Sequence, residues 1–195
     1  DSIRGRLLTD LASCYMIEGD IREAASQYLT ALDATSKSGD SEAYLTNCSS
    51  LGVAYRRINL PDSALYYYGK GLEAAMKSKD YSAVSNLHAN IAVMYISFKQ
   101  LENAKEHAQE AITYALKEED ALDWLQAYYI CGSLLVKTGE YDQAINYLHK
   151  AYGIASQQQS PRFRLKVLSA LLPAFQATAQ DDSVRYYLNV SDRFL

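Results

Sequence analysis

Side chains that most often carry chemistry are sparse and scattered in this 195-residue sequence. The histidines stand at His88, His107 and His149, and none has a second histidine or a carboxylate at the HExxH spacing that binds zinc on a helix. Gly69-Lys70-Gly71 lacks the GxxxxGK[ST] spacing of a phosphate loop, and no GxSxG or GxGxxG fingerprint occurs. The sequence therefore predicts no metal, no cofactor and no enzyme.

The three cysteines, Cys14, Cys48 and Cys131, are an odd set with wide spacing. They form neither a disulfide framework nor a CxxC motif, so we expect buried free thiols. Reduced thiols favour a cytoplasmic over a periplasmic setting.

Composition favours long helices. Hydrophobic residues make up 49% of the chain and charged residues 22%, while nine Gly and three Pro leave little room for a many-stranded fold. The net charge of −4 predicts no broad nucleic-acid surface. No apolar run is long enough for a membrane span, so we expect a soluble chain without membrane contact. Of the tyrosines 66–68, Tyr68 is expected in the core, and nucleic-acid stacking on the other two is the less favoured alternative.

A pattern of apolar, small, x, x, aromatic recurs every 40 residues. Its clearest copy is Leu51-Gly52-Val53-Ala54-Tyr55, and the others cover 11–15, 91–95, 131–135 and 171–175. A second small position follows twelve residues after the first, at Ala24, Ala64, Ala104, Ala144 and, enlarged, Val184. A fixed period of this length indicates stacked repeats.

Each period is predicted to form two helices, because apolar and small residues recur at intervals of three and four in both halves. Asp20, Asp40, Asp80 and Asp120 are expected N-caps, while Pro61 and Pro161 suit a first helical turn. The predicted helices are 2–18, 21–37, 41–58, 61–78, 81–97, 101–117, 121–137, 141–156, 162–178 and 182–194. The predicted repeats are 1–39, 40–79, 80–119, 120–159 and 160–195, in a single domain 1–195.

These residues resemble the tetratricopeptide repeat, whose pattern is W-x2-L-G-x2-Y followed by small, aromatic and small positions on a second helix. The resemblance covers nearly the whole chain and implies an all-α, right-handed α-solenoid of five helix-turn-helix repeats with ten helices. The 40-residue period is similar to a long-repeat subgroup in bacterial regulators and scaffolds. We interpret the sequence as a fragment of such a protein.

The resemblance also implies a binding surface, because first helices line a groove in this family. Carried over by register, with Asn90 added for its similarity to an asparagine ladder, the expected groove residues are Arg6, Thr9, Ser13, Ser49, Val53, Arg56, Asn86, Asn90, Val93, Gln126, Tyr129, Ser133, Lys137 and Lys166. The cations at these positions suit an acidic peptide. Alternatively, Arg56 and Lys137 are ordinary cations at helix C-termini, where the backbone dipole favours them.

The sequence thus predicts a non-enzymatic scaffold that binds a peptide or helix of a partner protein, as the interaction or sensing region of a larger bacterial regulator. Two alternatives stay open. An apolar end at Val190, Phe194 and Leu195 favours self-association as a homo-oligomer. An enzyme built on the repeats is the less favoured one.

Overall fold

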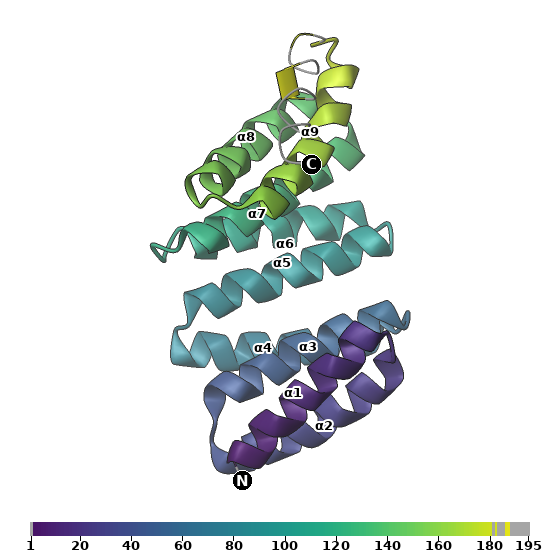
Figure 1. Cartoon of the computed structure of the whole chain (residues 1–195), viewed down its shortest axis with the longest axis vertical. Helices are drawn as coiled ribbons and strands as arrows, with labels where there is room; N and C mark the ends of the chain where they lie inside the picture. The colour runs from purple at the N-terminus through teal and green to yellow at the C-terminus, as the bar shows by residue number, and fades with distance from the viewer. Residues whose placement is uncertain (1, 181, 183–185, 188–195) are drawn as a thin grey trace. The chain divides into compact units, whose positions relative to one another are not determined.

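The chain is all-helical in the computed structural model, which describes residues 2–180, 182, 186 and 187 (Figure 1). These described residues form nine helices and no strand. The helices are α1 (Ser2–Glu18), α2 (Ile21–Ser38), α3 (Ser41–Arg57), α4 (Pro61–Ser78), α5 (Tyr81–Ser97), α6 (Leu101–Ala115), α7 (Ala121–Thr138), α8 (Tyr141–Gln157) and α9 (Pro161–Ala177).

Nine of the ten predicted helices are confirmed, with ends that agree to within two residues. The predicted tenth helix, 182–194, lies almost wholly outside the described residues. The count of five complete repeats therefore stays a prediction.

Capping aspartates and first-turn prolines explain why the helix boundaries could be predicted from the sequence. The carboxylate of Asp40 accepts a hydrogen bond from the Ala43 N–H at 3.2 Å, and Asp80 and Asp120 cap α5 and α7 in the same way. Pro61 and Pro161 occupy first helical turns, where a missing N–H costs nothing. The expected N-caps are therefore confirmed.

The chain divides into two compact units, residues 1–94 and 95–195. The N-terminal unit holds the α1–α2 and α3–α4 hairpins and all but the last turn of α5. The C-terminal unit holds that last turn, α6, the α7–α8 hairpin and α9. The predicted third repeat, 80–119, is thus shared between the units, and the single five-repeat domain stays a prediction.

Small residues let helices approach closely in the N-terminal unit. Ala12, Ala24, Tyr28 and Leu51 form one buried cluster, with α1 packed on both α2 and α3. At Gly52 the α3 backbone meets the ring of the fully buried Tyr68 so closely that an added Cβ would lie 2.3 Å from the ring. The predicted core position of Tyr68 is therefore confirmed.

The C-terminal unit has its own core. Leu125, Leu148, Leu171 and Phe175 are buried together, and α7 packs on α6, α8 and α9. The ring of Tyr187 stacks on Phe175, with centroids 5.5 Å apart. This core fixes α7 and α9 as neighbouring first helices.

The expectation of three buried thiols is wrong for Cys14. Cys48 and Cys131 are buried, whereas Cys14 is exposed, and all three are free. Cys14 lies on α1, which packs on α2 and α3 among the described helices.

Candidate functional site

The predicted binding residues lie on first helices, and they form two sets because the chain has two units. The N-terminal wall comprises Arg6, Thr9, Ser13, Ser49, Val53, Arg56, Asn86, Asn90 and Val93 on α1, α3 and α5. The C-terminal wall comprises Gln126, Tyr129, Ser133, Lys137 and Lys166 on α7 and α9. Each wall is described by itself.

Polar contacts join the first helices of the N-terminal wall. The Thr9 hydroxyl lies 2.9 Å from Asn47 Oδ1, which links α1 to α3, and Thr9 is buried. The Asn90 amide donates to Ser49 Oγ at 3.2 Å, which links α5 to α3. These wall residues therefore hold the helices in register as well as lining a surface.

An open hollow of about 650 Å³ lies between α3 and α5. Thr46, Ser49 and Asn86 line it, and its ionisable lining residues are Glu42 and Asp80. The hollow is thus rich in hydroxyl and amide groups and carries acidic side chains rather than cations.

Arg6 is not available as a lone cation. Its guanidinium donates to Asp40 at 2.8 Å and to Glu42 at 3.2 Å. The hydrogen bonds from Arg6, from Ser2 and from the backbone N–H of Ala43 hold the pKa of Asp40 well below its usual range. An acidic ligand at Arg6 would have to displace these two carboxylates.

The rest of the N-terminal wall is half-buried. Arg56 Nε is buried and has no hydrogen-bond acceptor among the described residues. Burial also raises the pKa of the neighbouring Tyr68 to about 12. Ser13 donates to the Thr9 carbonyl at 2.9 Å, while Val53 and Val93 add small apolar surfaces.

In the C-terminal wall the structure brings two predicted residues together. The Lys166 ammonium lies 4.5 Å from the ring centroid of Tyr129 and 5.6 Å from that of Phe163. The pKa of Lys166 is lowered by burial and by the positive charge of Arg162. Within the described part of the chain, no carboxylate forms an ion pair with Lys166 or Arg162.

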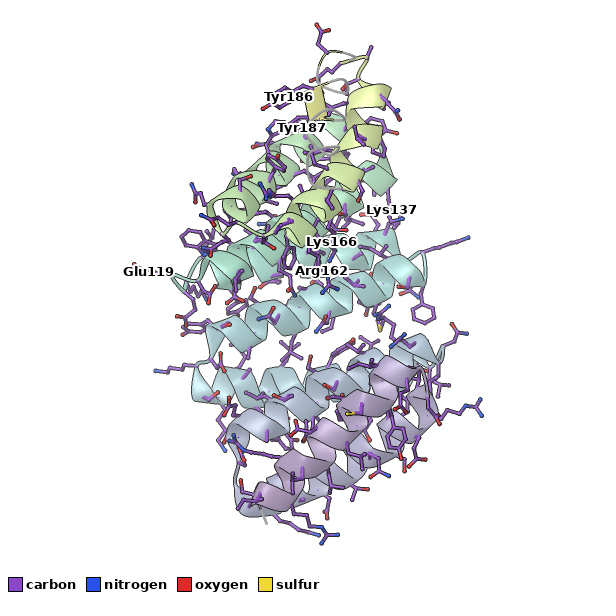
Figure 2. The ribbon with its side chains drawn as sticks, viewed as in Figure 1. Glu119, Lys137, Arg162, Lys166, Tyr186 and Tyr187 are labelled. Atoms are coloured by element: carbon purple, nitrogen blue, oxygen red, sulfur yellow. The ribbon has the colours of Figure 1, made fainter. Side chains whose placement is uncertain are left out.

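The remaining predicted residues of this wall flank that cluster along α7. Gln126 lies one turn before Tyr129 and is half-buried, and Ser133 Oγ is buried with no hydrogen-bond partner among the described residues. Lys137 is exposed in the last turn of α7. Figure 2 labels Lys137, which belongs to α7, and Arg162 and Lys166, which both belong to α9.

Sequence reasoning missed three residues that shape these walls. They are Glu42, Asn47 and Arg162. The available signal was the 40-residue period itself, because Arg162 stands three periods after Glu42 and carries the opposite charge. Asn47 gave no such signal.

A metal site and histidine chemistry find little support in the described residues. No group of three or more His, Cys, Asp or Glu suited to a metal ion occurs among the described residues. Burial lowers the pKa of His107 and of His149, and His149 packs edge-on against Phe175, with ring centroids 5.8 Å apart.

No helix in the described ranges has both the length and the apolar character needed to cross a bilayer.

Comparison with known families gives a clear match. The tetratricopeptide repeat pattern fits residues 4–77, and again 85–118 and 125–158. Together these segments cover well over half of the chain. The chain belongs to the tetratricopeptide repeat family. Tetratricopeptide repeat proteins bind protein partners and are generally not catalytic.

Solved structures share the tetratricopeptide fold with this chain. BtubC (BKLC) from P. vanneervenii superposes with a TM-score of 0.83 at 20% identity, covering 98% of this chain and 80% of that one. The TPR-like repeats of a putative kinesin light chain from Podosopora anserina give 0.75 at 17% identity, covering 100% and 96%. MamA gives 0.64 at 18% identity, covering 94% and 93%. No curated protein sequence matches the chain.

Proposed function

We propose that the first-helix walls of this tetratricopeptide repeat chain bind a segment of a partner protein, and that the segment over the C-terminal wall is acidic. The chain would then be the interaction or sensing region of a larger bacterial regulatory protein. The observation that carries the proposal is the Lys166 ammonium held over Tyr129 beside Arg162, with no carboxylate pairing either cation in the described residues.

Register comparison supports an acidic partner at this wall. Arg6 and Lys166 occupy the same register position four periods apart. Arg6 is neutralised by Asp40 and Glu42. Three periods after Asp40 and Glu42 stand Ser160 and Arg162, at the start of α9 itself, so the helix that carries Lys166 brings a second cation and no acid in its first turn.

The cations Arg162 and Lys166 and the ring of Tyr129 together suit a partner segment that carries carboxylates. A guanidinium donates two parallel hydrogen bonds to one carboxylate, and such charge-assisted bonds are among the strongest in proteins. Because Lys166 is partly desolvated next to another cation, an incoming anion relieves repulsion that the free protein carries. The Tyr129 ring offers an adjacent apolar surface.

The test starts from a random dodecapeptide library displayed on phage and selected against the whole chain. We expect the selected peptides to be enriched in Asp and Glu. Affinity is then measured by fluorescence anisotropy with labelled peptides. The double change Arg162→Glu with Lys166→Glu should weaken binding at least tenfold, or about 1.4 kcal/mol.

A matched control comes from α8, which contributes no residue to the C-terminal wall. Lys150 on α8 also lies over tyrosine rings, 5.4 Å from the Tyr128 centroid and 5.6 Å from that of Tyr147. Lys150→Glu removes the same kind of cation away from the wall, so it should leave peptide affinity unchanged. Equal losses for the two variants would refute the proposed position of the site.

A further inference from the structure

A pocket of about 330 Å³ lies in the C-terminal unit, bounded by α6, α7 and the first half of α8. Cys131 and Leu135 of α7 and Tyr147 of α8 line it, together with Lys105 and Glu140. Its lining residues, all within the described chain, include none from the C-terminal wall. It is therefore a separate feature of this unit, and we call it the Cys131 pocket.

Two side chains that line the pocket are smaller than their counterparts two periods earlier. Cys131 stands at the register position of Leu51, and Leu135 at that of Tyr55. In the N-terminal unit Leu51 is fully buried, and the ring of Tyr55 stacks on Tyr67, with centroids 5.4 Å apart and planes 7° apart. Together the two replacements remove as many heavy side-chain atoms as one benzene ring holds. The pocket therefore lies at the register place where the N-terminal unit packs an aromatic ring of its own.

The other member of that stacked pair is retained as Tyr147, which has different contacts. Its ring centroid lies 6.0 Å from that of Tyr128 and 5.6 Å from the Lys150 ammonium. Neither Tyr128 nor Lys150 lines the pocket, whereas Tyr147 does. Tyr147 therefore presents to the pocket a part of its surface that neither contact covers.

The inner part of the pocket is apolar and uncharged. Leu134 is fully buried, and Leu135 and Cys131 are nearly so. Burial raises the pKa of Tyr147 and raises that of Cys131 to about 11, so both groups are neutral at physiological pH. Because an ion would lose its hydration there, the inner part favours a neutral group.

The rim of the pocket is polar, but its charges are already paired. Lys105 of α6 forms an ion pair with Glu140, which also accepts a hydrogen bond from the Thr138 hydroxyl at 3.0 Å. The hydrogen bond between the two charged groups raises the pKa of Lys105 and lowers that of Glu140. The rim amides, from Gln109 and Gln143, supply neutral donors and acceptors. A ligand with one hydroxyl group can thus be oriented without breaking the ion pair.

We propose that the Cys131 pocket binds a small, neutral, single-ring aromatic molecule of the phenol class. Its ring would pack on Tyr147 as the Tyr55 ring packs on Tyr67, and its hydroxyl would meet the rim amides. Ligand pockets commonly have volumes of about 300–1,000 Å³, so this one suits a ligand at the small end of that range. The proposal does not depend on partner binding at the walls.

The first experiment uses p-cresol, which carries the ring and hydroxyl of a tyrosine side chain. Binding to the whole chain is measured by ligand-observed NMR titration, with the saturated analogue methylcyclohexanol as the matched control. We expect a dissociation constant of about 1 mM or below for p-cresol, which is reasonable for a ligand of this size. The control should bind at least threefold more weakly, because it cannot stack on a ring. Equal binding of the two, or no saturable p-cresol binding up to about 10 mM, would overturn the proposal.

Substitutions then locate the site. Cys131→Leu with Leu135→Tyr restores the filled arrangement of the N-terminal unit, so it should weaken p-cresol binding at least tenfold. The single change Leu135→Tyr takes its place if circular dichroism shows that the double variant does not fold. Leu116→Tyr is the matched control, because it adds the same ring at an exposed position outside the pocket and should leave affinity unchanged. Unchanged affinity in a folded variant with the filled pocket would overturn the proposal.

A tyrosine of a partner protein is the other source of a phenol ring. N-acetyltyrosinamide carries that ring on a peptide backbone. Under the proposal it binds no tighter than p-cresol, because the pocket holds the ring and gains nothing from the backbone amides. Binding at least tenfold tighter than that of p-cresol, and lost in Leu135→Tyr, would identify a partner's side chain as the occupant and overturn the proposal of a small molecule.

Discussion

The close approach at Gly52 makes a sharp prediction about stability. A Cβ placed on Gly52 would lie 2.3, 2.4 and 2.6 Å from three ring carbons of Tyr68. Carbon atoms in contact prefer about 3.5–4.0 Å, so the ring would have to move by about 1 Å or more. Tyr68 is fully buried, so its ring cannot move without displacing other side chains of the core.

Two opposing terms set the magnitude for Gly52→Ala. Overpacking a filled core costs about 1–3 kcal/mol. Replacing Gly by Ala within a helix gains about 0.8–1 kcal/mol from propensity. We therefore expect a net loss of about 0–2 kcal/mol in the free energy of unfolding, measured by urea denaturation and far-UV circular dichroism.

Gly69→Ala is the matched control for this prediction. Gly69 lies on the facing helix α4, and an added Cβ there meets nothing within 4 Å. Only the propensity gain applies, so this variant should be more stable than the original chain by about 0.5–1 kcal/mol. Equal stabilisation by Gly52→Ala and Gly69→Ala would refute the close-approach argument.

Three further predictions concern charge and buried polar groups. The folded pKa of Asp40 lies below its ordinary 3.8, so the stabilisation by this carboxylate is present above that pH and is lost as pH falls below it. Asp40→Asn should therefore make the free energy of unfolding, measured by urea titration, fall less steeply at acid pH. Burial lowers the pKa of His149 below 6.5, so stability should fall as pH drops from 7 to 5, and His149→Gln should make that fall shallower in thermal melts. The buried Tyr68 hydroxyl has no hydrogen-bond partner among the described residues, so Tyr68→Phe should be neutral or stabilising by about 1 kcal/mol in denaturation, and a clear loss would reveal a hidden partner.

Much of the fold was predictable because its determinants are local. Helix ends depend on residues such as Asp80 and Pro61 that cap or begin the same helix, and these gave boundaries correct to within two residues. Stacking depends on small and large residues at a fixed register, which the 40-residue period displays directly. Fold prediction therefore needed no knowledge of distant contacts.

The state of the site residues was harder to predict, because it depends on residues about one period away. Arg6 meets Asp40 and Glu42, which lie 34 and 36 positions later in the sequence. Asp40 was correctly predicted as an N-cap, yet the same carboxylate also neutralises Arg6. The exposure of Cys14 likewise depends on what packs on α1, which its neighbours in sequence do not reveal.

Equal register positions consequently do not carry equal function in this tetratricopeptide repeat chain. The first-turn position held by Glu42 on α3 becomes Ser82 on α5, Leu122 on α7 and Arg162 on α9, so the charge at one repeated place changes from negative to positive. Arg6, the cation in the first repeat, forms an ion pair with Glu42 at that position, whereas Lys166 lies on the same helix as the cation Arg162. Under the proposed function, the ligand charge that each wall favours would therefore depend on first-turn residues such as Glu42 and Arg162 as well as on the wall residue itself.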